Sequence, residues 1–313
     1  MKVILAQPRG FCAGVERAID VVEESLKRHL GPVYVRHEIV HNRHVVDNLR
    51  EKGAVFVDEI EEIPEGAPVI FSAHGVSKEV RSAANFRALN AIDATCPLVT
   101  KVHKQVSRLH SMGYEILLIG HEGDPEVEGT LGQLEGNIRL IQSVADAETI
   151  EVRHPWRVAY VTQTTLSLDD TAAIVAVLKR RFPALEGPPT ADICYATQNR
   201  QEAVKRLAGV TDVVIVVGAE NSSNSNRLVE VARSHGTPAH RVASAAELED
   251  DWFGGDQTVG ITAGASVPET LVEEVADFLR ERFGAEVGED AGGFREEVFF
   301  PLPIELREEQ KAV

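Results

Sequence analysis

Three cysteines are the residues of this chain with the most specific chemistry, because each stands directly before a helical pattern. Cys96 is followed by Pro97, which suits the first position of a helix, and then by apolar side chains at helical spacing. Cys12 and Cys194 precede similar patterns. Backbone N–H groups and the dipole at a helix N-terminus lower the pKa of a thiol and favour bound negative charge. The sequence therefore predicts that thiolates of Cys12, Cys96 and Cys194 gather around a metal centre.

The number and spacing of these cysteines limit the centre that they could form. Three widely separated cysteines argue against a disulfide framework. Three thiolates leave one position of a four-iron cluster, or of a tetrahedral ion, without a protein thiolate, and an open position is reactive. A zinc site would usually bring C-x-x-C or Cys/His pairs at finger spacing, and neither occurs. Composition alone equally allows three buried thiols that act as small hydrophobic side chains.

Several polar side chains could bind a substrate beside such a centre. Imidazoles and neutral donors of the kind that a diphosphate requires stand in predicted loops, at His41, His74, Ser222, Ser223, Asn224 and Ser266. The sequence has no Walker A pattern and no G-x-G-x-x-G with its acidic partner, which disfavours a nucleotide. Glu126 could shuttle protons if burial raises its pKa, and Thr164 could orient a substrate hydroxyl. Taken singly, the hydroxyl residues also suit turn caps, and Glu126 also suits a solvated loop.

The elements that must position these residues are strands of parallel sheets. Short apolar, β-branched runs, usually followed by a helical pattern, occur at Val3–Ala6, Val33–Val40, Val69–Ala73, Ile116–Ile119, Val158–Val161, Val213–Val217 and Val259–Ala263. Nearly every run ends in a polar loop rich in Gly or Ser. Ligands of open parallel sheets bind beyond the carboxyl ends of the strands, so these loops could converge on one site.

The three cysteines divide the chain into similar lengths with similar patterns. This predicts an α/β fold of three parallel modules related by approximate threefold repetition, each offering one thiolate to a common centre. We expect modules at residues 14–97, 98–193 and 194–282, the last together with residues 1–13. Residues 283–313 form a C-terminal tail, whose Phe-rich piece we expect to pack back on the body while its last few residues fray.

Length and charge exclude several classes of protein. The chain has 313 residues, 43% of them hydrophobic, and a net charge of −17. This charge disfavours a nucleic-acid partner and an anionic membrane surface, although a local pocket for a small anion remains possible. No apolar run approaches the length of a membrane span, and Val3–Ala6 is too short for a signal peptide. We therefore expect a cytoplasmic protein.

One matching motif does not fit its surroundings. The stretch His37-Glu-Ile-Val-His41 has the H-E-x-x-H pattern of zinc proteases, which requires a helix so that residues four apart share a face. The flanking residues and the internal Ile39-Val40 predict a strand instead. On a strand the two histidines would lie about 13 Å apart, too far to bind one ion. We therefore reject the zinc-protease interpretation.

The motifs together resemble the 4-hydroxy-3-methylbut-2-enyl diphosphate reductase family (IspH/LytB). The resemblance covers roughly residues 1–280 and rests on Arg9-Gly-Phe-Cys-Ala-Gly-Val15, His37-Glu-Ile-Val-His-Asn42, Ser72-Ala-His-Gly-Val76, Asp93-Ala-Thr-Cys-Pro97, Pro125-Glu-Val-Glu-Gly-Thr130, Thr162-Gln-Thr-Thr-Leu166, Ile193-Cys194, Asn221-Ser-Ser-Asn-Ser-Asn-Arg-Leu228 and Gly264-Ala-Ser266. It implies three α/β modules around a pseudo-threefold axis, with a [4Fe–4S] cluster held by Cys12, Cys96 and Cys194. It also implies the last step of the methylerythritol phosphate route to isoprenoids, in which an allylic hydroxyl is removed by reduction to give isopentenyl and dimethylallyl diphosphates.

The resemblance also implies roles for individual residues. The diphosphate would be held by His41, His74, Ser222, Ser223, Asn224 and Ser266. Thr164 and Glu126 would order the substrate hydroxyl and deliver protons. Electrons would come from a ferredoxin or flavodoxin, because the sequence has no flavin or nicotinamide fingerprint of its own. We further expect a monomer.

One position departs from the family pattern. The family usually carries histidine immediately before Pro125, and this chain carries Asp124. A desolvated carboxylate that faced a diphosphate would be repulsive. Either Asp124 points away, or His121 supplies the missing donor, or the substrate is handled differently; we expect reductase activity with a rearranged diphosphate contact. Two other functions remain alternatives, a zinc hydrolase and a redox-inert protein that binds diphosphates.

Overall fold

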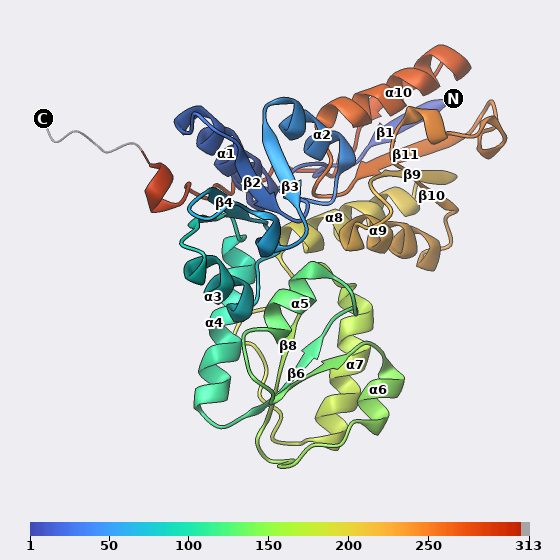
Figure 1. Ribbon diagram of the computed structural model, residues 1–313. Helices are drawn as coiled ribbons and strands as arrows, with labels where there is room; N and C mark the ends of the chain where they lie inside the picture. The colour runs from blue at the N-terminus through green and yellow to red at the C-terminus, as the bar shows by residue number, and fades with distance from the viewer. Residues whose placement is uncertain (308–313) are drawn as a thin grey trace, which may run out of the picture.

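The chain forms three α/β modules, each built on its own parallel sheet, as predicted (Figure 1). The computed structural model describes residues 1–307. The first sheet has the order β3-β2-β4-β5, with strands at Ala54–Val57, Val33–Arg36, Pro68–Phe71 and Asn90–Asp93. The second has the order β7-β6-β8, at Ile138–Ile141, Glu115–Ile119 and Val158–Thr162. The third has the order β10-β9-β11-β1-β12, at Ala239–Val242, Val213–Val217, Thr258–Ala263, Lys2–Leu5 and Glu286–Glu289.

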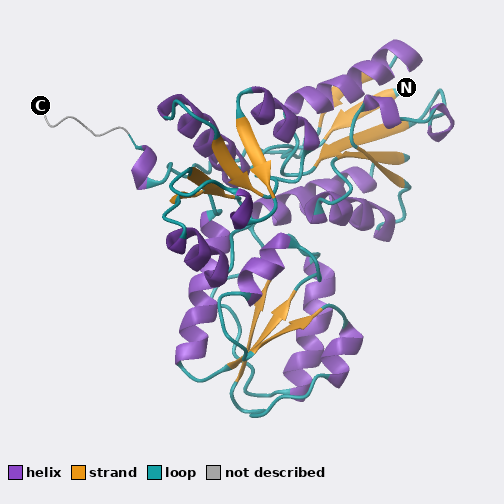
Figure 2. Ribbon diagram, in the orientation of Figure 1, coloured by secondary structure: helices purple, strands orange, loops and turns teal. Residues whose placement is uncertain are grey.

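Helices flank the strands of each sheet (Figure 2). They are α1 (Ala13–Arg28), α2 (Arg43–Glu51), α3 (Lys78–Phe86), α4 (Pro97–Ser111), α5 (Pro125–Leu131), α6 (Val144–Thr149), α7 (Leu168–Arg181), α8 (Tyr195–Ala208), α9 (Ser223–Ser234) and α10 (Glu269–Phe283). In the described part of the chain, none of these helices has the length and apolar character needed to cross a membrane.

All seven strands predicted from the sequence are present, but five further strands were not predicted. The five are β3, β5, β7, β10 and β12, and each lies at the edge of its sheet. Polar side chains interrupt four of these five strands, because an edge strand is covered less completely than a central strand. Strand β3 is apolar throughout, so this reason does not explain why it was missed.

The predicted strand at residues 33–40 is too long. Strand β2 ends at Arg36, because His37 has a φ of 59°, in the left-handed region that interrupts a strand. Residues 37–41 form a bend rather than the expected strand, so the strand spacing used to separate His37 from His41 was wrong. The bend is not a helix either, so the H-E-x-x-H zinc geometry is absent here.

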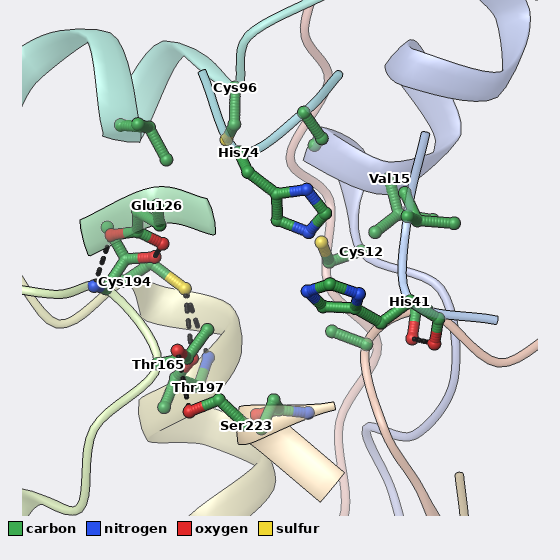
Figure 3. A pocket seen from close by; sticks show the side chains of 18 of the residues that line it. Cys12, Val15, His41, His74, Cys96, Glu126, Thr165, Cys194, Thr197 and Ser223 are labelled. Atoms are coloured by element: carbon green, nitrogen blue, oxygen red, sulfur yellow. Dashed lines mark hydrogen bonds between the residues drawn. The ribbon is translucent and has the colours of Figure 1, made fainter. Parts of the chain in front are cut away.

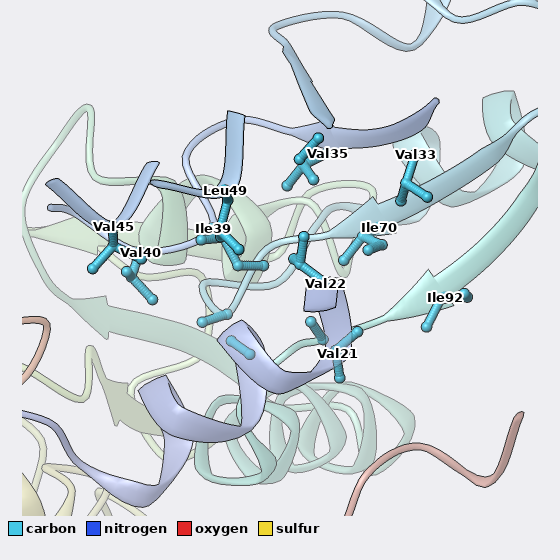
Figure 4. Packing of buried hydrophobic residues seen from close by; sticks show 14 of the residues in the cluster. Val21, Val22, Val33, Val35, Ile39, Val40, Val45, Leu49, Ile70 and Ile92 are labelled. Atoms are coloured by element: carbon cyan, nitrogen blue, oxygen red, sulfur yellow. The ribbon is translucent and has the colours of Figure 1, made fainter. Parts of the chain in front are cut away.

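The core of the first module shows how a cysteine-bearing helix is fixed to its sheet (Figure 4). Val21 and Val22 of α1 are fully buried against Val35 of β2 and Ile70 of β4. Burial of such a side chain contributes about 1.5–3 kcal/mol. The apolar face of α1 therefore sets where its N-terminus, and hence Cys12, is placed.

The tail after α10 returns along the body of the protein. Strand β12 pairs with β1 at the edge of the third sheet, and further on Leu306 is buried in the core of the first module. The phenylalanines contribute less than expected, since Phe299 is 79% exposed. The predicted fraying of the last residues concerns positions 308–313, which lie outside the described residues.

Candidate functional site

The three cysteines meet at one pocket between the modules (Figure 3). Cys12, Cys96 and Cys194 are the residues that immediately precede α1, α4 and α8, so the prediction that each stands at a helix N-terminus is confirmed. None of them forms a disulfide. The pocket also contains every other site residue predicted from the sequence, namely His41, His74, Glu126, Thr164, Ser222, Ser223, Asn224 and Ser266.

Gly14 allows two of the sulfurs to approach each other. A Cβ atom at this position would lie 2.8 Å from Cys96 Sγ and 3.8 Å from Cys12 Sγ. The first distance is shorter than a nonbonded contact allows, so a side chain here would displace the sulfur of Cys96. The third sulfur, Cys194 Sγ, contacts the backbone N–H of Thr197 at 3.4 Å and its hydroxyl at 3.2 Å.

The expectation that the helix N-termini lower the pKa of these thiols is wrong for two of them. Burial raises the pKa of Cys96 to about 12, and the nearby Cys12 raises it further. Burial likewise raises the pKa of Cys194 to about 11. Backbone N–H groups do act in the predicted direction, but desolvation outweighs them. Such thiols become thiolates when a cation binds between them.

Each cysteine is also tied to a loop that carries substrate-binding candidates. The Cys12 N–H donates to Ala265 O, beside Ser266, at 3.2 Å, and the Cys96 N–H donates to Ala73 O, beside His74, at 2.9 Å. The Cys194 N–H donates to Thr164 O at 3.0 Å. The three modules therefore repeat one local arrangement, in which a loop after a strand holds the peptide of a cysteine.

Glu126 and Thr164 form a buried pair at one wall of the pocket. Glu126 is 5% exposed, and its two carboxyl oxygens accept from the Thr164 N–H and the Thr164 hydroxyl, both at 2.7 Å. Burial raises the pKa of Glu126 to about 8, with a further contribution from Asp124. The carboxyl group is therefore largely protonated at neutral pH and is equipped to act as an acid.

Asp124 lines the pocket, but both of its oxygens are already engaged. One accepts from the Glu126 N–H at 2.9 Å as the N-terminal cap of α5, and the other accepts from Gln163 Nε2 at 2.7 Å. His121 does not line this pocket; its Nε2 instead contacts Arg227 at 2.9 Å. His121 does, however, share a neighbouring pocket with His41, Asp124 and Ser223.

Two histidines stack at the opposite wall. The rings of His41 and His74 lie 4.2 Å apart between centroids, with an interplanar angle of 27°. His41 Nδ1 contacts Glu38 and Asn221, each at 3.2 Å, whereas the buried His41 Nε2 has no partner. Burial lowers the pKa of His74 well below its ordinary value. Imidazole nitrogens that lack a protein partner are suited to a ligand.

Helix α9 points its N-terminus at the same space. Ser222 caps this helix, and the buried amide group of Asn224 has no partner for either its oxygen or its nitrogen. Ser266 donates its hydroxyl to His41 O at 2.9 Å, which joins the third module to the first. Backbone N–H groups and the dipole at a helix N-terminus favour anions. These residues are suited to an anion, and together they are called the anion site below; no lysine or arginine lines the pocket.

Two polar pocket residues were not predicted from the sequence. Thr197 contacts Cys194 Sγ, and Thr165 donates its hydroxyl to Ser223 Oγ at 3.1 Å. Thr197 could have been found from its position three residues after Cys194, the expected cap, because the cap side chain commonly bonds to the backbone N–H at that position. Thr165 shares a polar loop with Thr164, and the sequence alone does not show which of two adjacent threonines faces the ligand.

The residues present fit an iron–sulfur cluster. The donor set consists of three sulfurs at the mouths of three helices, and Gly14 leaves room for two of them to approach. Within residues 1–307, no group of three or more His, Cys, Asp or Glu side chains is arranged to hold a single metal ion.

Comparison with known proteins gives consistent matches along the chain. The model of a family described as LytB protein matches residues 3–280. A 4-hydroxy-3-methylbut-2-enyl diphosphate reductase of Azoarcus sp. (strain BH72) is 57% identical over 307 residues and covers 98% of each chain. The protein of the same name from Bordetella pertussis is 57% identical over 302 residues, covering 96% of this chain and 93% of that protein.

Two solved structures share the fold. The E-1-hydroxy-2-methyl-but-2-enyl-4-diphosphate reductase from Plasmodium falciparum matches with a TM-score of 0.90 at 37% identity, covering 97% of this chain and 96% of that chain. A second structure, of an (E)-4-hydroxy-3-methyl-but-2-enyl diphosphate reductase described as the terminal enzyme of the non-mevalonate pathway, matches with a TM-score of 0.65 at 38% identity. It covers 90% of this chain and 100% of that chain.

Proposed function

The chain belongs to the LytB family of reductases, and from that premise we propose that its pocket converts 4-hydroxy-3-methylbut-2-enyl diphosphate to isopentenyl and dimethylallyl diphosphates. The observation that carries this proposal is the composition of one pocket. Three sulfurs, a protonated buried carboxyl group and an anion site share the same space. Each is required by a reaction that delivers electrons and protons to an alcohol whose other end is a diphosphate.

The diphosphate end of the substrate would occupy the anion site. The His41 Nε2 atom and the Asn224 amide group are buried and have no protein partner, so a ligand would satisfy them. Ser222, Ser223 and Ser266 add hydroxyl groups, and the N-terminus of α9 adds its dipole. His74 stacks on His41 and completes this side of the pocket. A diphosphate would favour the protonated imidazole of His74, against the effect of burial.

The hydroxyl end would lie beside Glu126 and Thr164. Cys12, Cys96 and Cys194 would hold a [4Fe–4S] cluster, which would supply the two electrons of the reaction one at a time. Two protons are also consumed, one by the hydroxyl group, which leaves as water, and one by the allylic carbon skeleton. Glu126 holds a proton at neutral pH, and the hydroxyl group of Thr164 lies 2.7 Å from its carboxyl oxygen. Because a hydroxyl both donates and accepts, this pair orients the substrate alcohol and delivers the proton.

The partners follow from the same chemistry. Electrons would come from a ferredoxin or flavodoxin, since the sequence has no flavin or nicotinamide fingerprint. A monomeric state and a cytoplasmic location stay predictions from the sequence.

The test is anaerobic purification followed by iron and sulfide analysis and a turnover assay with a chemical one-electron donor. We expect about four irons and four sulfides per chain, absorption at about 400 nm, and reduction of the allylic diphosphate. Stoichiometric zinc with no chromophore would support the hydrolase alternative. Ligand binding without turnover in iron-loaded protein would support the binding-protein alternative. A Mössbauer spectrum would show whether one iron differs from the others.

A further inference from the structure

Three basic side chains behind the pocket join the three cysteine segments in a ring. They are Arg17 on α1, Lys101 on α4 and Arg200 on α8, and each therefore lies on the helix that follows one of the cysteines. None of them lines the pocket. Each donates hydrogen bonds to backbone carbonyls in the segment that precedes the next cysteine along the chain, and the last one closes the ring.

Arg17 links the helix of Cys12 to the loop before Cys96. Its guanidinium group donates to the carbonyls of Ala94 and Thr95, both at 3.1 Å, and more distantly to that of Asp93 at 3.4 Å. Its Nε donates outward to Pro301 O at 2.9 Å. The tail therefore covers this link on the side away from the pocket.

Lys101 links the helix of Cys96 to the loop before Cys194. Its ammonium group donates to Thr190 O at 3.1 Å and to Ala191 O at 2.9 Å. It also lies 3.3 Å from the buried carboxylate of Asp192. Lys101 is the only charged partner of that carboxylate among the ion pairs of residues 1–307.

Arg200 links the helix of Cys194 to the loop before Cys12. Its side chain is fully buried, and it donates to Gly10 O at 2.6 and 3.1 Å and to Phe11 O at 3.1 Å. Glu296 of the tail pairs with it at 3.1 Å. The order of the links is therefore from Cys12 to Cys96, from Cys96 to Cys194, and from Cys194 back to Cys12.

We propose that Arg17, Lys101 and Arg200 are positioning residues that hold the three cysteine segments at fixed relative positions, each fixing the segment of the next cysteine rather than its own. The cysteines belong to segments far apart in the sequence, so their helices alone cannot set the relative positions of the sulfurs. A cation that bonds to two or three carbonyls replaces the water that these groups would otherwise need. The ring therefore keeps the sulfurs of Cys12, Cys96 and Cys194 together and slows release of the group that these sulfurs bind. The statement about release rests on the proposed cluster, whereas the order of the links does not.

The test uses hydrogen exchange in the full chain purified anaerobically, read in three segments around Gly10–Cys12, Asp93–Cys96 and Thr190–Cys194. Lys101→Met is the first variant, because Lys101 is partly exposed and its loss leaves the helix intact. Lys104→Met is the matched control, since Lys104 lies exposed on the same helix and the change removes the same charge. We expect Lys101→Met to accelerate exchange about tenfold or more at Thr190–Cys194, with little change at Asp93–Cys96, and Lys104→Met to change neither.

A second variant checks the direction of the ring independently. Arg17→Met should accelerate exchange at Asp93–Cys96 and leave Thr190–Cys194 near the wild-type rate. Iron release to a chelator from the loaded enzyme should be faster in both variants by about the same factor as exchange. The proposal would be overturned by any of three results. Exchange could accelerate in the segment of the variant's own cysteine, it could accelerate equally in all three segments, or it could accelerate no more than in Lys104→Met. A chain that binds no cluster but shows the predicted order in exchange would overturn the proposed function and leave the ring in place.

Discussion

Replacement of Glu126 by glutamine tests whether this carboxyl group is held protonated in the folded protein. Glutamine has the same shape, and its carbonyl oxygen can keep the bond from the Thr164 N–H while its amide group donates to the Thr164 hydroxyl. The change therefore removes the titration and keeps the contacts. Any difference between the two proteins that depends on pH is then assigned to the carboxyl group.

The size of the effect follows from the shift in pKa. Burial raises the pKa of Glu126 from 4.5 to about 8. Between these two values the folded protein binds one proton more than the unfolded chain, so the stabilising effect is complete below the lower value and is lost as the pH rises through about 8. When the folded and unfolded states differ by one bound proton, the free energy of unfolding changes by about 1.4 kcal/mol for each pH unit. Between about pH 6 and pH 8 the free energy of unfolding of the wild type should therefore fall by about 2–3 kcal/mol more than that of Glu126→Gln.

The assay is urea unfolding of both proteins after removal of iron, because a bound cofactor would break two-state behaviour. For each protein we take the change in the free energy of unfolding between the two pH values. The change in the variant is then subtracted from the change in the wild type. Equal changes in the two proteins would show that Glu126 does not carry the raised pKa, and its role as an acid would fail with it. Turnover by the iron-loaded variant should be slower by about 10²–10⁴-fold if the carboxyl group delivers a proton.

Three other substitutions give sharp outcomes. Cys96→Ser should abolish iron binding and turnover together, whereas an inert buried thiol would tolerate the change at a cost of about 1–2 kcal/mol and retain activity. Gly14→Ala should lower the iron content, because its Cβ would lie 2.8 Å from Cys96 Sγ. A change from Gly to Ala in a helix usually raises stability by about 1 kcal/mol. If the variant showed that gain and bound iron fully, the packing argument would be contradicted. Asp124→His removes a carboxylate from the pocket and should lower the Michaelis constant for the diphosphate, and an unchanged or higher constant would count against the rearranged contact that we expect at this position.

Local patterns in the sequence were enough to identify most of the regular structure. Six of the seven predicted strands are central in their sheets, and central strands of parallel sheets are buried on both faces and therefore read as continuous apolar runs. The seventh, β8, lies at the edge of its sheet and is nevertheless mostly buried. The helix starts at Cys12, Cys96 and Cys194 were predictable for a similar reason, since a helix N-terminus is a local feature of its own residues. Five other edge strands were missed, four of them because polar side chains interrupt their apolar pattern.

The environment of the site residues was harder to predict than their identity. The motifs identified the residues that line the pocket, but the pKa values of Cys96 and Cys194 moved opposite to expectation. A helix N-terminus is visible in the sequence, whereas the desolvation that outweighs it arises only when the folded chain buries the pocket. The bend at His37 was missed because a left-handed residue in place of a strand has no apolar signature.

The sequence by itself determined the residue types of this protein's chemistry, the parallel α/β character of its modules and the family to which it belongs. These properties depend on periodicity and on short motifs, which are local in the chain. The tertiary structure alone decided that Asp124 is bonded to Gln163 where it lines the pocket, that Glu126 is buried against Thr164, and that Arg17, Lys101 and Arg200 connect the cysteine segments in a ring. Each of these contacts joins residues that are far apart in the chain, so each is fixed by tertiary packing and not by a local pattern.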